Sequence, residues 1–217
     1  MSNTEATRAD VCALAVAECF RDDGEIMASA MGATPILGAR LAKRTFEPDL
    51  VMTDGFNLIL RRALPLGAKP ADDDVEGWMP FGTVFDTLWW GRRHVMMGAS
   101  QIDQFGNQNI ACIGQWENPK AQLLGVRGAP GNTINHVTSY WVPNHNARAL
   151  VAKVDMVSGV GYDRAAALGP EGTEGTGPAA PDGGGPAGWE AADLAGEAAR
   201  LPLVYRFEHR EGGVALD

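Results

Sequence analysis

The stretch Gly98-Ala99-Ser100-Gln101-Ile102-Asp103-Gln104-Phe105-Gly106-Asn107-Gln108-Asn109 decides the fold of this chain. Residues 94–102 read as an extended, apolar strand, Gly106-Asn107 is a turn signal, and residues 108–113 return as a second strand. The pattern therefore predicts a hairpin over residues 94–113. Such a hairpin occurs in α/β and in all-β proteins, so it does not by itself indicate a function.

Upstream of the hairpin, the sequence predicts a strand–helix–strand unit. Residues 25–29 and 50–53 read as strands, and Thr34-Pro35 marks the start of a helix between them. The two strands should be parallel neighbours joined by a right-handed crossover. Thr53 and Asp54 would then lie at the carboxyl end of a parallel strand, where ligands bind in open α/β sheets. The predicted fold class is α/β, with an open, mainly parallel sheet flanked by helices.

The other elements are predicted from shorter signals. Thr7 and Asp10 form a capping box for a first helix over residues 7–20, with an apolar face that includes Val11 and Leu14. A helix over residues 80–90 carries aromatic residues, which we expect in the core because large apolar side chains are normally buried: Phe81, Phe85 and Trp89. Further strands are predicted over residues 122–126, 137–142 and 149–158, whereas residues 61–79 read as irregular, with a solvated acidic loop over 71–74.

The predicted domain organisation has one α/β domain over residues 1–168. Residues 169–188 contain eight glycines and four prolines and read as a mobile loop or linker. Residues 189–217 are expected to add a helix and a strand to the same domain.

The composition excludes several classes of function. The 18 basic and 27 acidic residues give a net charge of −9, which disfavours nucleic acid as a partner. The three cysteines and four histidines show no metal-binding spacing, so we expect no metal site and reduced, mostly buried thiols. No apolar run reaches the length of a membrane span, and we expect a cytoplasmic protein with no membrane partner.

A glycine-rich segment, Gly128-Ala129-Pro130-Gly131-Asn132, is the first candidate binding site. Backbone N–H groups approach a ligand closely where no Cβ intervenes, and consecutive N–H groups bind a carbonyl oxygen or an enolate. Gly128, Ala129, Gly131 and Asn132 are therefore candidate substrate-binding residues. The alternative interpretation is an ordinary glycine turn.

Arginines near this segment and before the hairpin are candidate anion-binding residues. Arg93 and Arg127 suit phosphates or substrate carboxylates, because the guanidinium group binds such anions through two parallel hydrogen bonds. The alternative is a solvated surface or an ion pair between subunits.

The wording of the hairpin resembles the GAxQID-x-(Y/F)GN-x-N signature of class I coenzyme A transferase β subunits, the glutaconate type in particular. Three further stretches share this resemblance, so that it covers roughly residues 25–162: FDTLWWGRRHVMMGASQID (85–103), GVRGAPGN (125–132) and AKVDMVSGVGY (152–162). The resemblance implies the fold of these transferases and a CoA thioester substrate. It also implies a homologous α subunit, in an α2β2 assembly, with residues 128–132 near the acyl group. No separate cofactor is implied, since coenzyme A enters as part of the substrate.

The sequence departs from the transferases at the predicted strand end. Those enzymes attack the thioester with a glutamate in an E-(S/N)-G motif, whereas this chain has Thr53-Asp54-Gly55. That departure resembles the branch of the fold whose members hydrolyse a carbon ring of steroid-derived CoA thioesters, in a retro-Claisen manner. It implies water as the acceptor, catalytic roles for Asp54 and Thr53, and a general base on the α subunit.

Two alternatives to the hydrolase stay open. The first is a true CoA transferase β subunit that uses Asp54 as its nucleophile. The second is a non-catalytic ligand-sensing or scaffold subunit with the same fold. Asp54 itself has a simpler interpretation as the cap of a turn, because Asp-Gly is a strong turn signal.

Overall fold

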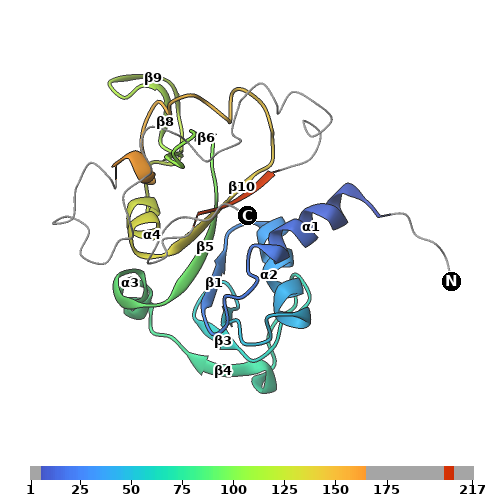
Figure 1. Cartoon of the computed structure of the whole chain (residues 1–217). Coiled ribbons are helices and arrows are strands. Elements are labelled where there is room, and N and C mark those ends of the chain that lie inside the picture. Colours follow the sequence, from blue (N-terminus) through green and yellow to red (C-terminus); the bar gives the residue numbers. More distant parts are fainter. Residues whose placement is uncertain (1–5, 165–202, 208–217) are drawn as a thin grey trace. The chain divides into compact units, whose positions relative to one another are not determined.

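The computed structural model describes residues 6–164 and 203–207 of the 217-residue chain (Figure 1). The chain divides into two compact units, one ending at Met97 and the other beginning at Gly98. The predicted loop over 169–188 and the predicted helix over 189–200 lie outside the described residues. Within the part of the chain that is described, no helix has the length and apolar content needed to cross a bilayer.

Two packed helices dominate the first unit, α1 (Arg8–Glu18) and α2 (Ala33–Thr45). The predicted capping box of α1 is confirmed, since Thr7 N donates to Asp10 Oδ2 over 2.8 Å and Asp10 N donates to Thr7 Oγ1 over 3.3 Å. The helices touch at Gly38, where a Cβ would lie 2.2 Å from Val16 Cγ1. Helix α1 buries Cys12, Val16 and Ala17. The predicted face, Val11, Leu14, Ala15 and Cys19, is correct only in part, because Cys19 is buried whereas Val11 and Leu14 are exposed.

The predicted strand–helix–strand unit is confirmed. Strand β1 (Met27–Ala30) precedes α2, and Val51 follows it as a parallel bridge partner of Met27. Val51 N donates to Ile26 O, and Ala28 N donates to Val51 O, each over 2.9 Å. On its other edge, β1 pairs in parallel with β5 (Arg93–Gly98), whose residues 94–97 are all buried. A continuous buried run is typical of a strand in a parallel sheet covered on both faces.

A small antiparallel sheet follows, in the order β2 (Met52–Thr53), β3 (Leu58–Leu60) and β4 (Val75–Trp78). Residues 61–79 were therefore wrongly predicted to be irregular throughout. The strand β4 alternates between half-buried and exposed residues and contains a glycine, so its apolar signal is weak. The short 3₁₀ helix η1 (Asp72–Asp74) precedes β4. Its Asp74 is buried, and Arg62 Nε and Ala71 N both donate hydrogen bonds to the buried carboxylate. The solvated acidic loop is thus correct only for Asp72 and Asp73.

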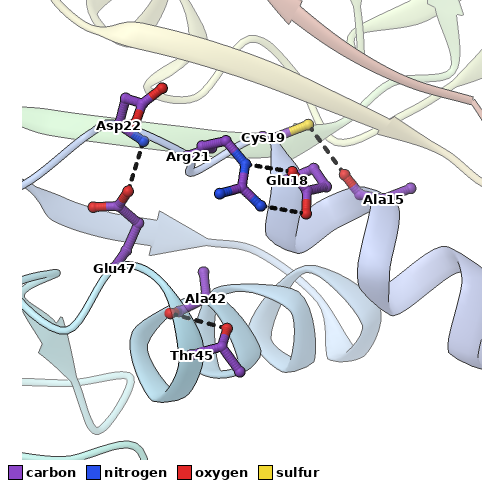
Figure 2. A network of polar contacts seen from close by, with 8 residues as sticks. All are labelled: Ala15, Glu18, Cys19, Arg21, Asp22, Ala42, Thr45 and Glu47. Atoms are coloured by element: carbon purple, nitrogen blue, oxygen red, sulfur yellow. Dashed lines mark hydrogen bonds and ion pairs between the residues drawn. The ribbon is translucent and has the colours of Figure 1, made fainter.

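A buried carboxylate holds the loop between α1 and β1 in place. Glu47 accepts hydrogen bonds from Asp22 N, over 2.6 Å, and from Gly24 N, over 3.1 Å (Figure 2). Asp22 has a φ of 62°, a left-handed conformation that needs such support in a residue other than glycine. The neighbouring Arg21 and Glu18 form a two-pronged ion pair on the surface.

Helix α3 (Phe81–Trp90) follows β4 as predicted, but its aromatic residues are not in the core. The exposed fractions of Phe81, Phe85 and Trp89 are 76%, 54% and 62%. The core prediction for these side chains was wrong. Large apolar side chains are buried on average, but residue type alone does not show whether another element covers a given helix face.

The second unit contains the signature stretch, which forms a shorter hairpin than predicted. Strands β6 (Gln101–Ile102) and β7 (Gln108–Asn109) pair around the expected turn. The flanking residues pair elsewhere, because residues 93–98 form β5 and residues 112–115 form β8 (Cys112–Gln115), the antiparallel partner of β9 (Asn118–Gln122). The predicted extent, residues 94–113, was therefore wrong although its centre is confirmed.

The chain then forms α4 (Ala129–Asn135) and β10 (Val137–Val142), and β10 pairs with β11 (Leu203–Phe207), drawn in red in Figure 1. The strand predicted over 137–142 is confirmed, and the last strand falls within the predicted C-terminal part. The strands predicted over 122–126 and 149–158 were wrong. Residues 123–126 have no regular structure, and the turn comes after them at 127–128. Residues 149–158 are irregular, because their hydrogen bonds go to the signature hairpin.

Candidate functional site

Thr53 and Asp54, the two predicted catalytic residues, lie where β2 ends. The prediction of a parallel strand holds only for Val51, because β2 itself pairs antiparallel with β3. Asp54 Oδ1 accepts hydrogen bonds from Phe56 N, over 2.9 Å, and from Leu58 N, over 3.1 Å. Thr53 Oγ1 accepts from Gly55 N over 3.2 Å. Both side chains thus stabilise the turn between β2 and β3, as the simpler interpretation of Asp54 requires. The geometry leaves Asp54 Oδ2 as the carboxylate oxygen that the turn does not use.

Arg93, the third predicted site residue of the first unit, begins β5 and is half-buried. Its Nε donates to Ser29 Oγ on β1 over 3.1 Å, which fixes the direction of the guanidinium group. Burial lowers the pKa of Arg93, because a charged group loses hydration away from water. A cation held in this way favours a nearby anion. The adjacent Arg92 is exposed.

The predicted glycine-rich loop is in fact a turn that runs into helix α4. Positive φ angles occur at Gly125, 82°, and at Arg127, 48°, ahead of the helix. Gly131 lies within the first turn of α4 and is not among the residues with positive φ. In that turn the backbone N–H groups have no partner inside the helix. The Gly131 N–H, which the sequence prediction places in a loop, therefore belongs to the first turn of a helix.

The exposed Arg127 is notable for its backbone. A left-handed φ is uncommon for a residue other than glycine, and strained residues gather at functional sites. Arg127 immediately precedes Gly128, the N-cap of α4. The positively charged Arg127 is therefore close in sequence to the first turn of α4, which contains the Gly131 N–H.

Behind α4 the second unit has a small pocket that sequence reasoning missed. It is lined by Phe105 and Gly106 from the signature turn, by side chains of α4 and β10, and by residues 160–162: Thr133, His136, Thr138, Tyr140, Val160, Gly161 and Tyr162. Thr133 Oγ1 donates to Ala129 O over 3.0 Å and accepts from Val160 N over 2.9 Å. The pocket therefore joins the predicted acyl-binding segment to the signature stretch.

Two groups in this pocket are buried and ionisable. His136 ends α4 and has an exposed fraction of 5%, and Tyr140 on β10 has 1%. Burial raises the pKa of Tyr140, and the nearby Tyr162, once it ionises, and the Asp103 carboxylate act in the same direction. Tyr140 therefore stays neutral and serves as a hydrogen-bonding group. No sequence motif marks His136 or Tyr140, because each becomes part of a pocket only when distant segments meet.

Asp103 is the centre of a network that we call the signature clasp. Its Oδ1 accepts from Phe105 N and from Asn107 N, each over 3.1 Å, and Asn107 Nδ2 donates to both of its oxygens. Asn107 also donates to Asp163 Oδ1 over 2.8 Å and accepts from Gly161 N over 2.8 Å. The clasp binds the hairpin turn to residues 161–163.

A second part of the clasp lies at the base of the hairpin. Gln101 donates to Asp155 Oδ2 over 3.1 Å and accepts from Asp155 N over 3.0 Å. Asn109 donates to Gln101 Oε1 and to Cys112 O, each over 2.7 Å. Two stretches that share the transferase resemblance, 98–109 and 152–162, are therefore held together by their own polar side chains.

The predicted site residues fall into two groups. Thr53, Asp54 and Arg93 belong to the first unit, and Arg127 to Asn132 are continuous in the second. Asn132 is buried, and its carbonyl accepts from Thr138 Oγ1 over 3.3 Å. Asn132 therefore stabilises the junction of α4 and β10.

Comparison with known proteins gives consistent results, although no family model matches the chain. The chain is 58% identical over 159 residues to the cholesterol ring-cleaving hydrolase IpdB subunit of Mycobacterium tuberculosis H37Rv, covering 73% of this chain and 64% of that subunit. The crystal structure of Rhodococcus jostii RHA1 IpdAB matches with a TM-score of 0.72 and 55% identity, over 78% of this chain and 66% of that chain. Glutaconate coenzyme A-transferase from Acidaminococcus fermentans matches with a TM-score of 0.60 and 24% identity, over 73% of this chain and 64% of that chain. The chain has the CoA-transferase fold.

Within the CoA-transferase fold, this chain is a homologue of the IpdB subunits. The resemblance inferred from the signature hairpin is thereby confirmed, as is the predicted fold class. The chain spans less than two thirds of the length of these relatives, 64% for the mycobacterial subunit.

Proposed function

We propose that this chain acts as the β subunit of a heteromeric hydrolase that opens a carbon ring of a steroid-derived, cyclic oxo-acyl-CoA. The observation that carries the proposal is the 58% identity to the IpdB subunit of a cholesterol ring-cleaving hydrolase. The strand end supports it, because Thr53-Asp54-Gly55 offers no glutamate to store an acyl or CoA group. A homologous α subunit in an α2β2 assembly and a cytoplasmic location are parts of the same proposal.

In the proposed reaction, water gives a proton to the general base as its oxygen adds to a ring ketone, and the addition forms a tetrahedral alkoxide. The bond from that carbon to the carbon α to the thioester then breaks. Its electron pair forms a thioester enolate, which takes up a proton on carbon. The product keeps its coenzyme A and gains a carboxylate that contains the oxygen of water.

Five of the predicted site residues have a proposed role in this reaction. We assign the Gly131 N–H to the enolate oxygen, because a fixed backbone donor stabilises charge that develops there. Arg93 and Arg127 would bind phosphates or carboxylates of the substrate. Asp54 would orient water through Oδ2, since Oδ1 is held by the turn, and Thr53 would keep that turn in place. The general base belongs to the α subunit.

The strongest alternative is a CoA transferase in which Asp54 is the nucleophile. An aspartate is one methylene shorter than the expected glutamate, and an error of about 1 Å in position costs roughly 10²-fold in rate. Two backbone N–H groups also bind Asp54 Oδ1 and hold the carboxylate against the turn. These contacts favour a positioning role over attack on a thioester.

Isotope labelling of the assembled α/β complex distinguishes the two reactions. With a cyclic oxo-acyl-CoA in ¹⁸O-labelled water, we expect one labelled oxygen in the new carboxylate of a product that retains coenzyme A. Hydroxylamine trapping during turnover should leave Asp54 unmodified. A trapped thioester at Asp54, or CoA transfer to added carboxylic acids as fast as ring opening, would establish the transferase instead. Binding of the thioester without any turnover would favour the sensor or scaffold.

A further inference from the structure

The exposed face of α3 is the feature of the first unit that the proposed function leaves unexplained. Phe81, Phe85 and Trp89 follow one another at intervals of four residues and so lie on the same side of the helix. The rings of Phe81 and Phe85 meet edge to face with centroids 5.5 Å apart. More than half of each of these three side chains is exposed. We call this set the α3 aromatic face.

Two more exposed aromatic residues adjoin the start of α3. Trp78, 63% exposed, ends β4 three residues before Phe81, and its strand partner is Leu58. Phe56, 81% exposed, precedes Leu58 by two residues, and Met79 N donates to Asn57 O over 2.7 Å beside it. The turn before β3 and the end of β4 therefore lie together.

Together with Trp78 and Phe56, the α3 aromatic face approaches the area of one side of an interface. At about 150–250 Å² for each aromatic side chain, the α3 aromatic face exposes roughly 300–480 Å². Adding Trp78 and Phe56 brings the exposed aromatic surface to about 500–800 Å² by the same measure. The largest apolar patch on a typical monomer is roughly 300–600 Å², and each partner in a stable complex contributes about 800 Å². The surface is thus large enough to form most of one side of a stable interface.

The residue types, charge and shape of the α3 aromatic face indicate what kind of partner it binds. Asp86 is the single charged residue within the helix sequence FGTVFDTLWW, so the face suits an apolar surface. A second copy of the chain is disfavoured, because two copies that each carry a net charge of −9 repel one another. A small molecule is disfavoured as well, since ligand sites are concave and one side of a single helix is convex.

We infer that the α3 aromatic face is the surface on which the homologous α subunit docks, with an apolar patch of that subunit against Phe81, Phe85 and Trp89. The inference rests on the proposed function, which requires such a subunit. It adds the location of the contact and its apolar character. Aromatic residues enriched in this way carry most of the binding energy in many interfaces.

The test measures binding of this chain to the partner subunit of Rhodococcus jostii IpdAB by sedimentation velocity and titration. The variant F81S/F85S/W89S removes the aromatic face, and Trp116→Ser is the matched control, because Trp116 is 54% exposed on the β8–β9 hairpin. Both variants should keep the circular dichroism and melting temperature of the unmodified chain. We expect the triple variant to bind at least about 100-fold more weakly, the scale of losing several interface hot spots, and Trp116→Ser to bind as the unmodified chain does.

The outcomes separate this inference from the proposed function. Equal binding by the triple variant overturns the docking face, even if the complex hydrolyses its substrate. Failure of the unmodified chain to bind the subunit also overturns it, as does loss of a homodimer with heteromeric binding intact. Binding that depends on α3, in a complex that opens no ring, supports the docking face and refutes the proposed function.

Discussion

Gly161 is a residue whose missing side chain makes room for the turn of the signature hairpin. A Cβ at this position would lie 2.3 Å from Phe105 O and 2.6 Å from Asn107 N, both backbone atoms that cannot move aside cheaply. The Gly161 N–H meanwhile donates to Asn107 Oδ1. Close approach, rather than a positive φ, is therefore the reason for glycine here.

We expect Gly161→Ala to lower the free energy of unfolding by about 2–4 kcal/mol, the range for overpacking together with loss of a buried hydrogen bond. Urea unfolding followed by circular dichroism measures this change. Gly82→Ala is the control, because Gly82 is exposed on α3 and a Cβ there meets nothing within 4 Å. The control should be neutral or stabilising by up to about 1 kcal/mol. Equal stability of the two variants would contradict the close packing at Gly161.

Because of Tyr140, we expect the free energy of unfolding to decrease at alkaline pH. Its pKa is raised in the folded chain, so its contribution to stability is complete below the unfolded pKa of about 10 and is lost as the pH rises above that value. We expect the unfolding free energy of the unmodified chain to fall more steeply between about pH 9.5 and 11 than that of Tyr140→Phe. Urea midpoints across this range measure both slopes. Parallel slopes would show that Tyr140 ionises freely in the folded chain.

At the scale of elements, features that depend on one short stretch of sequence were predicted better than pairings between distant segments. The capping box at Thr7, the turn at Gly106-Asn107 and the unit formed by β1, α2 and Val51 each depend on residues within one short stretch. The extent of the hairpin was wrong because β5 pairs with β1, some sixty-odd residues away in the register Met27 to Arg93. Similarly, residues 149–158 alternate as a strand does, yet their partners are the side chains of Gln101 and Asp103.

The signature clasp can be tested at Asn107, which links Asp103, Asp163 and Gly161. Asn107→Ala removes these contacts and leaves the buried Asp103 carboxylate with fewer donors, so we expect a loss of roughly 2–4 kcal/mol in unfolding free energy. Asn118→Ala, on the exposed strand β9, should change it by less than about 0.5 kcal/mol. Hydrogen exchange should also quicken at Gly161 and Tyr162 in the Asn107 variant alone. Unchanged protection there would mean that the clasp does not hold residues 161–163.

At the scale of the whole molecule, the sequence predicted where chemistry is expected but not its surroundings. Thr53, Asp54 and residues 128–132 were predicted because a strand end and a glycine-rich segment are visible in one stretch, and their roles stay predictions. The pocket of Thr133, His136 and Tyr140 was not, because it forms only when α4, β10 and residues 160–162 meet. The exposure of the α3 aromatic face was not predicted either, because the sequence shows that the helix is apolar but not whether another element covers it.

The proposed heteromer makes a prediction for the isolated chain. Alone, it should show no ring-opening activity, because the proposed mechanism assigns the general base to the α subunit. Adding that subunit should restore turnover in proportion to the complex formed, up to one active site for each pair. Coupled assays across a titration, with complex measured by sedimentation, give this comparison. Full activity of the chain by itself would contradict the need for a partner.

The signature clasp and the turn after β2 are held by separate sets of contacts. The side chains of Gln101, Asp103, Asn107 and Asn109 bond to the protein's own backbone and to each other, so they record ancestry in the scaffold and not the chemistry of the catalyst. The turn after β2, in contrast, depends mainly on a cap that Asp54 supplies. The contacts of the clasp and the contacts of this turn are separate, so a substitution at position 53 or 54 leaves the contacts of the signature residues in place.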